Sequence, residues 1–377
     1  MVNFETELIH IFKNSTLKAG VIQDCIMKIP TPLRVLNSSE LEHGRKIGSK
    51  GIAVPNFPHQ VFEITKFMKP ERLLEFIKNA DVSATILNEV KRVSNRAGIY
   101  RLTIFHPVVN RKFTITEEIN KKLIEMQISS GVDLISILDE YNSSLSNFKK
   151  RLEKSMIQIE DSGQYMEPMP TIRIDSDYKL FGEKIETAIA ERVKIINITY
   201  AAIKQNFTNY SYLINLARQK EKKVWIHMSE VPRRLFRKVP TMHILPLFGI
   251  DSYALNSKPF PIGLIKREEV AAKRFDKDTL KYLTLLEHSK LYGDHPNCNC
   301  FVEIRDKLSD SLSVFQAAEI LSSALTCHEA ICSYYELLKF RNAIIKKESK
   351  NYLVRKQILI EPIKKLLKID LAQQELS

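Results

Sequence analysis

The sequence has little glycine, few cysteines and no long apolar run, and each shortage excludes a class of protein. Glycine accounts for 11 of the 377 residues, and no glycine-rich loop follows a predicted strand, which argues against a Rossmann or P-loop nucleotide site. No stretch approaches the roughly 20 apolar residues that a membrane-spanning helix needs. The N-terminus also lacks the pattern of a signal peptide. We therefore expect a cytoplasmic protein that is not bound to a membrane.

The cysteine pattern indicates metal binding rather than disulfides. The five cysteines are Cys25, Cys298, Cys300, Cys327 and Cys332. An odd number in a chain without a secretion signal argues against a disulfide framework. Four of the five lie in the last third of the chain, where a metal ion could hold them together.

Positive charge is in clear excess. The chain contains 57 Lys and Arg residues against 44 Asp and Glu, which gives a formal net charge of +13. Such an excess attracts polyanions by long-range steering and counterion release. Charge alone leaves two alternatives open, nucleic-acid binding and an ordinary solvated surface rich in lysine.

Short β-branched runs alternate with longer amphipathic segments through the centre of the chain. The predicted strands are Ile99–Phe105, Asp133–Leu138, Thr171–Ile174, Ile195–Tyr200, Val224–His227 and His243–Leu247. The predicted helices are Ile115–Ser129, Ser146–Glu160, Phe181–Glu191, Tyr210–Lys220 and Val231–Lys238. This alternation is typical of βαβ units with parallel strands. A long series of such units favours a closed barrel over an open sheet, so we expect an α/β fold of the (β/α)₈ TIM-barrel type.

Two regions are expected from this pattern. Residues 1–290 would form the barrel, and residues 291–377 would form a loop rich in Cys and His followed by a basic helical subdomain that ends in the tail Lys346–Leu371. On the predicted helix Val231–Lys238, four basic residues are suited to contact phosphates or to form a solvated face. They are Arg233, Arg234, Arg237 and Lys238.

Three separated segments follow the order of motifs in a known family. The first is Lys18-Ala-Gly-Val-Ile-Gln followed by Ile29-Pro-Thr-Pro-Leu, and the second is Gly131-Val-Asp-Leu-Ile-Ser-Ile-Leu-Asp-Glu140. The third is Cys298-Asn-Cys300, followed by His328 and by Tyr335-Glu-Leu-Leu-Lys-Phe-Arg-Asn-Ala-Ile344. In these segments the chain resembles the tRNA-guanine transglycosylases, the queuine and archaeosine tRNA-ribosyltransferases, as a divergent archaeal-type member without the appended RNA-binding domain.

The resemblance implies a reaction and two carboxylates. The family exchanges guanine in a polynucleotide for a 7-deazaguanine-type base through a covalent Asp-glycosyl intermediate, and some relatives act on DNA. By this resemblance Asp139 would bind the edge of the base. The nucleophile motif resembles Phe248-Gly-Ile-Asp251-Ser-Tyr-Ala-Leu: aligning the glycines puts Ala254 at the nucleophile position, whereas a two-residue deletion puts Asp251 there. We expect Asp251 to be the nucleophile.

The family also holds one structural zinc ion, through a Cys-x-Cys-x-x-Cys motif and a histidine that begins a helix. The matching positions are Cys298, Cys300, Glu303 and His328, with Cys327 or His295 as substitutes for the missing third cysteine. Thiolate and imidazole ligands at these spacings suit tetrahedral zinc. We expect one zinc ion per chain.

Two departures weaken the catalytic interpretation. The proton-shuttle motif is not visible, because its Asp would correspond to Pro55 in the segment that ends at Gln60. The glycine-rich base-binding loop is not recognisable. At the end of a predicted strand, His227 could contact the substrate or be a structural histidine.

Three functions remain open. The chain could be a base-exchanging glycosyltransferase on tRNA or DNA. It could be a non-catalytic paralogue that binds nucleic acid or an active partner subunit, as a homodimer or a heterodimer. It could also be an unrelated barrel enzyme for a small anionic substrate. Whether Asp139 and Asp251 face each other across one pocket discriminates between the first two functions.

Overall fold

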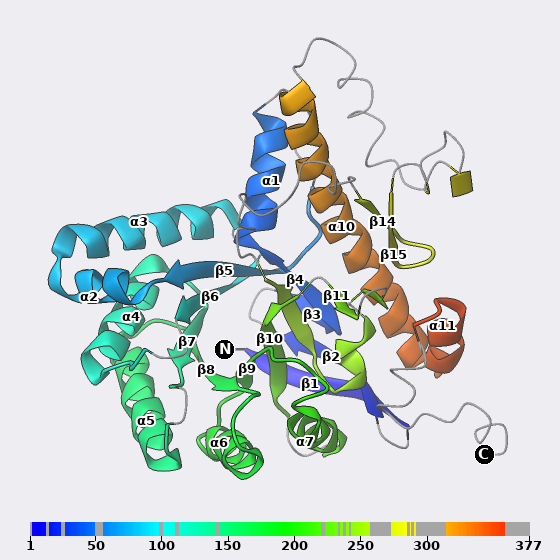
Figure 1. Ribbon diagram of the computed structural model, residues 1–377. Coiled ribbons are helices and arrows are strands. Elements are labelled where there is room, and N and C mark those ends of the chain that lie inside the picture. The colour runs from blue at the N-terminus through cyan, green and yellow to red at the C-terminus, as the bar shows by residue number, and fades with distance from the viewer. Residues whose placement is uncertain are drawn as a thin grey trace.

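The computed structural model describes residues 2–12, 15–23, 27–49, 56–97, 101–109, 113–140, 143–219, 223–232, 234–236, 239–240, 243–256, 273–284, 287, 290–291 and 314–358. Eight parallel strands close into a barrel in the order β10-β13-β4-β5-β6-β7-β8-β9 (Figure 1). They are β4 (Leu33–Asn37), β5 (Val61–Met68), β6 (Leu102–Val109), β7 (Leu134–Leu138), β8 (Glu167–Arg173), β9 (Ile195–Thr199), β10 (Trp225–Val231) and β13 (Ser252–Leu255). The expected α/β barrel is confirmed.

Helices follow most of the strands and cover the outside of the barrel (Figure 1). They are α1 (Ser38–Gly48), α2 (Pro70–Lys78), α3 (Ala80–Ala97), α4 (Glu117–Ser130), α5 (Leu145–Asp161), α6 (Tyr178–Ala190) and α7 (Phe207–Arg218). Side chains of Thr116, Ser144 and Asp177 cap α4, α5 and α6 by accepting hydrogen bonds from backbone N–H groups of the first turn. These caps fix where each helix begins after its strand.

A three-stranded antiparallel sheet closes the amino-terminal end of the barrel, which we call the base. It consists of β1 (Asn3–Phe12), β2 (Ser15–Gln23) and β3 (Lys28–Thr31). Apolar side chains of this sheet, such as Phe4 and Ile22, pack in one cluster with Val61 and Trp225 of the barrel strands. Apolar packing therefore closes the base of the barrel.

The connection from β10 to β13 differs from the prediction. The segment predicted as the helix Val231–Lys238 contains the end of β10 and the strand β11 (Arg234–Phe236), which pairs with β12 (Val239–Pro240). The segment predicted as the strand His243–Leu247 contains the 3₁₀ helix η2 (Leu245–Leu247). Both predictions were wrong because Pro232 and Pro246 interrupt the periodic patterns on which they rested.

A long helix packs against one side of the barrel. Helix α10 (Val314–Ile345) contacts α1, β4 and the basal sheet, and α11 (Ser349–Arg355) follows it. The hairpin β14 (Lys273–Asp276) and β15 (Lys281–Thr284) lies against α10 (Figure 1). No helix in the described part of the chain is long and apolar enough to cross a membrane.

Candidate functional site

The barrel interior changes from apolar to polar along its axis. Towards the base it is filled by apolar residues, among them Leu102, Leu134 and Ile195. Further along the strands the buried side chains become polar. Alternate residues of a strand share one face, so the interior set continues in polar positions on most of the strands. These positions are Asn37, Glu63, His106, Ser136, Thr171, Asn197 and His227.

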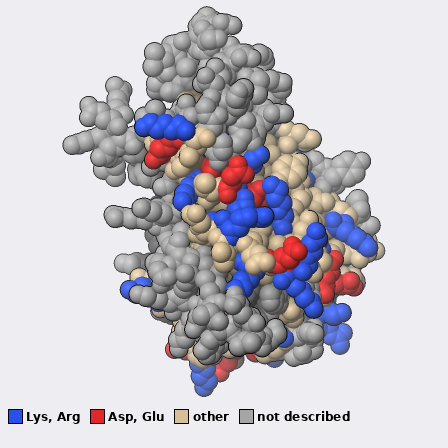
Figure 2. Space-filling view, turned by 90° about the vertical axis from the view of Figure 1, so that its right-hand side faces the viewer, with Lys and Arg blue, Asp and Glu red and all other residues tan. Residues whose placement is uncertain are grey.

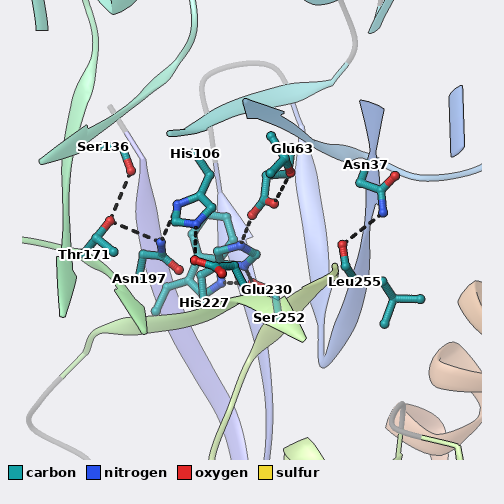
Figure 3. A network of polar contacts seen from close by, with 12 residues as sticks. Asn37, Glu63, His106, Ser136, Thr171, Asn197, His227, Glu230, Ser252 and Leu255 are labelled. Atoms are coloured by element: carbon teal, nitrogen blue, oxygen red, sulfur yellow. Dashed lines mark hydrogen bonds and ion pairs between the residues drawn. The ribbon is translucent and has the colours of Figure 1, made fainter. Parts of the chain in front are cut away.

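A hydrogen-bonded chain crosses the barrel in the lower part of this polar region (Figure 3). The Trp225 Nε1–H donates to Ser252 Oγ at 2.7 Å, and Ser252 Oγ lies 2.8 Å from His227 Nδ1. His227 Nε2 lies 2.9 Å from Glu63 Oε2. Each donor in this chain has an acceptor if the Ser252 hydroxyl donates to His227 Nδ1 and the His227 Nε2–H donates to Glu63. All four side chains are fully buried, so this chain is a structural floor.

A second set of contacts lies nearer the carboxyl ends of the strands, which we call the mouth. His106 Nε2 lies 3.2 Å from Glu230 Oε1, and His106 Nδ1 lies 3.3 Å from Asn197 Nδ2 (Figure 3). Asn197 Nδ2 also donates to Thr171 Oγ1, which lies 3.2 Å from Ser136 Oγ. Side chains from β6, β7, β8, β9 and β10 are therefore connected across the barrel.

A pocket of about 400 Å³ opens above this network. Its lining residues come from the ends of five strands and from the start of α2: Phe67, Met68, Lys69, Pro70, Val108, Val109, Arg173, Thr199, Tyr200 and Glu230. Its volume suits a small molecule or a single nucleoside. Barrel enzymes place their chemistry at this end of the strands.

Glu230 supplies the carboxylate of this pocket. Its side chain is 22% exposed, whereas that of its partner His106 is 1% exposed. The backbone of Glu230 has φ +58°, in the left-handed region, and lies where the β10–β13 pairing shifts register. This conformation costs a non-glycine residue about 1 kcal/mol or more and is common at functional sites. Here it turns the carboxylate inward.

The ionisation of His106 depends on that carboxylate. Burial alone would lower the pKa of His106, but the hydrogen bond to Glu230 and the charges of Glu63 and Glu230 outweigh it and raise the pKa above its ordinary value. The carboxylate of Glu230 therefore increases the affinity of His106 for a proton.

Three buried polar atoms near the pocket have no hydrogen-bond partner among the described residues. They are Asn197 Oδ1, Thr199 Oγ1 and Ser229 Oγ. An unsatisfied buried polar group costs about 1–3 kcal/mol. Thr199 lines the pocket, and Asn197 lies on the same face of β9. A bound ligand could satisfy these atoms.

The remaining polar lining is cationic or hydroxylic. Arg173 forms two hydrogen bonds with Asp175, both at 3.1 Å, which fix its guanidinium at the rim. Burial raises the pKa of Tyr200 to about 12, so this residue stays a neutral hydrogen-bonding group.

Asp139 lies where the sequence placed it, directly after β7 at the mouth end. Its carboxylate is buried and bound, because Lys184 Nζ lies 2.5 Å from Oδ2 and Ser143 Oγ donates to Oδ1 at 2.5 Å. Burial raises its pKa, and the charge of Lys184 opposes that change. Asp139 is not among the residues that line the mouth pocket.

Asp251 lies at the opposite end of the barrel. It directly precedes β13 and so lies at the amino-terminal end of that strand. Its Oδ2 lies 2.7 Å from Lys18 Nζ of the basal sheet and accepts a hydrogen bond from the Ile226 backbone N–H. Burial raises the pKa of Asp251 to about 6, although Lys18 opposes this. The structure does not bring Asp139 and Asp251 to one pocket.

The other expected site residues are only partly described. His227 lies inside the barrel, below the pocket. Arg234 begins β11, while Arg233, Arg237 and Lys238 lie outside the described residues.

Of the expected metal ligands and their substitutes, the structure describes His328 and Cys327, and both are buried. Cys298, Cys300, Glu303 and the alternative His295 lie outside the described residues. His328 is buried on α10, with Nε2 2.7 Å from the Phe275 carbonyl oxygen and Nδ1 3.6 Å from Cys332 Sγ. Among the described residues, no group of three or more His, Cys, Asp or Glu side chains could hold a metal ion.

Sequence reasoning missed Glu63, His106 and Glu230. Each interrupts an apolar strand with a charged or titratable residue, which is an unusual choice for a strand buried on both faces. That signal was present in the segments Phe62-Glu-Ile and Phe105-His-Pro.

A comparison of the chain with protein-family models finds no matching family, and a comparison with curated proteins finds no relative.

Proposed function

We propose that the chain is a base-exchanging glycosyltransferase that acts on a nucleic acid, tRNA or DNA, at the mouth of its barrel. One observation carries the proposal. The partly exposed carboxylate of Glu230 lines a nucleoside-sized pocket, paired with His106 and close to buried polar atoms that lack partners among the described residues.

Glycosyl exchange needs an anion beside the anomeric carbon, because its transition state resembles an oxocarbenium ion. A Glu230 oxygen would form the bond to that carbon while the bond to the departing base breaks and its electron pair leaves with the base. The departing base would take up a proton from solvent in the pocket, while His106, whose side chain is 1% exposed, would act through Glu230 by holding its carboxylate in place. The incoming 7-deazaguanine-type base would reverse these steps.

Glu230 fits this role better than the residues expected from the sequence. Asp251 is fully buried at the base and bound to Lys18, and Asp139 is bound to Lys184. Neither carboxylate lines the mouth pocket.

The test is exchange of labelled guanine, or of a labelled 7-deazaguanine base, into a pool of tRNA and into DNA. We expect exchange by the parent, none by Glu230→Gln, and a rate near that of the parent for Asp251→Asn, provided that each variant is folded. Exchange lost in Asp251→Asn but kept in Glu230→Gln would overturn the assignment.

A second candidate is a non-catalytic paralogue that binds nucleic acid or an active partner subunit. It is favoured by the positions of Asp139 and Asp251, which lie at opposite ends of the barrel and share no pocket. It is also favoured by Ala254, which occupies the nucleophile position when the glycines are aligned and is fully buried in β13. Binding of nucleic acid without exchange, with tRNA and DNA both tried, would select this candidate.

We also propose one structural zinc ion, held by Cys298, Cys300, His328 and either Glu303 or Cys327. One observation supports this role for His328. Its Nε2 lies 2.7 Å from the Phe275 carbonyl oxygen, and metal-bound histidines usually make such a contact through the ring nitrogen that does not bind the metal. The zinc would tie the loop that carries Cys298 to α10.

A further inference from the structure

The end of α10 and the whole of α11 are unusually basic. Between residues 339 and 356 there are seven Lys and Arg residues and one acidic residue, Glu348. Figure 2 views the side of the molecule on which α10 and α11 lie and shows Lys and Arg side chains gathered there. This segment therefore concentrates positive charge.

The two helices form a groove of about 330 Å³ at this place. It is lined by Lys339, Asn342, Ala343, Lys346, Glu348, Asn351, Tyr352 and Arg355. Two amide side chains, three cations and one carboxylate make its surface polar. An apolar peptide or helix would find little to pack against.

Two neighbouring cations are engaged within the protein. The buried Glu336 carboxylate lies 2.6 Å from Lys339 Nζ and 2.9 Å from Lys356 Nζ, and accepts from the Tyr352 hydroxyl at 3.1 Å. These contacts fix the floor of the groove and hold α11 on α10.

Two cations of the groove are not engaged in this way. Within the described part of the chain, neither Lys346 nor Arg355 forms an ion pair, and both are exposed. The Arg355 guanidinium lies 5.7 Å from the centre of the Tyr352 ring, which limits its freedom before any ligand binds. Ordered cations lose less entropy when they bind an anion.

We propose that the groove between α10 and α11 binds the phosphate backbone of a nucleic acid, with Lys346 and Arg355 as the phosphate contacts. The occupant is a sugar–phosphate backbone because the groove offers positive charge and amide donors but little apolar surface. Such a contact depends on the charge of the phosphates and not on the base sequence of the nucleic acid.

The groove lies on the flank beside the basal sheet, since α10 packs against β1 and Arg341 of α10 forms an ion pair with Glu7 of β1. It is therefore separate from the mouth pocket. The inference shares its nucleic-acid partner with the proposed function but not its chemistry, so the two can fail independently.

The experiment measures the affinity of the full chain for a labelled duplex oligonucleotide between about 50 and 300 mM salt, a roughly sixfold range over which counterion release strongly changes the affinity. The test variant is Lys346→Glu/Arg355→Glu. The matched control is Lys121→Glu/Lys150→Glu, which changes the net charge equally in a comparable groove between α4 and α5. A thermal melt of each variant checks that it is folded.

We expect the test variant to lose two phosphate contacts, which lowers the log–log salt slope by about 1.8 and the affinity near 150 mM salt by roughly tenfold to thirtyfold. The control should retain the parental slope. An equal loss in both variants would reduce the effect to net charge and overturn the proposal. Tighter binding of poly-glutamate than of the duplex would assign the groove to an acidic protein instead.

Discussion

The Glu230 carboxylate and the His106 imidazole meet at 3.2 Å across the full width of the barrel. Glu230 belongs to β10 and His106 to β6, and these strands are separated by three others in either direction around the barrel. The contact thus spans the barrel near its mouth, directly below the pocket. Substitution of either residue should change the ionisation of the other and should have little effect on the packing of the outer helices.

Replacing the carboxylate should lower the pKa of the histidine. In Glu230→Gln the charged partner is lost while burial and the charge of Glu63 remain, so the pKa of His106 should fall from its raised value. An NMR titration of the His106 ring protons measures this. The control is Glu140→Gln, whose carboxylate pairs with Arg151 instead. An unchanged titration in Glu230→Gln would contradict the pairing.

Asp251 should make stability depend on pH with a sign opposite to that of an ordinary surface carboxylate. Burial raises its pKa from 3.8 to about 6 in the folded state, so the folded protein takes up this proton first. The free energy of unfolding should therefore gain roughly 2.4 kcal/mol from this group as the pH falls from 7 to 4. Denaturant titrations of the parent and of Asp251→Asn at several pH values give the difference. If that difference does not change with pH, the assignment is wrong.

Two glycines with positive φ should differ in their tolerance of alanine. Gly249 has φ +76°, and a Cβ there would lie 2.5 Å from Ala217 Cβ, whereas Gly131 has φ +70° and nothing within 4 Å. Gly131→Ala should cost about 1 kcal/mol from backbone strain alone. Gly249→Ala should cost clearly more, because α7 must move away from the turn before β13. Equal losses in denaturant titrations would argue against this packing.

Metal content tests the proposed zinc ion. Protein purified without chelators should contain one zinc per chain by elemental analysis, and His328→Ala should reduce both the zinc content and the melting temperature. Cys25→Ala, which removes a cysteine outside the proposed set, should change neither. Parent protein with well under one equivalent of zinc and an unaltered melt in His328→Ala would count against the site.

The sequence predicted the barrel because parallel strands leave a strong pattern. Five of the predicted strands overlap β6 to β10, each of which contains at least two β-branched residues. Strand β13 was missed since Ser252-Tyr-Ala-Leu255 is short and has no β-branched residue. Sequence patterns also placed Asp139 correctly at a strand end.

The candidate site could not be predicted in the same way. Glu230 and His106 are 124 positions apart, and only the closure of the barrel brings them together. The resemblance indicated Asp251, but it could not show on which side of β13 that residue lies. Local sequence patterns predict that a helix or strand is present. They do not predict where the strand begins, and the start of the strand decides at which end of the barrel a neighbouring residue lies.

Closure of the barrel also affects how the chain folds while it is being synthesised. The first and last barrel strands, β4 and β13, are neighbours, and the Asn37 side chain donates to the Leu255 carbonyl over 218 positions. During synthesis the edge of β4 that pairs with β13 therefore stays unpaired until nearly the whole barrel has left the ribosome. Such an edge invites pairing with other chains, and contacts so distant in sequence form slowly. The growing chain should thus depend on shielding from aggregation for most of its translation.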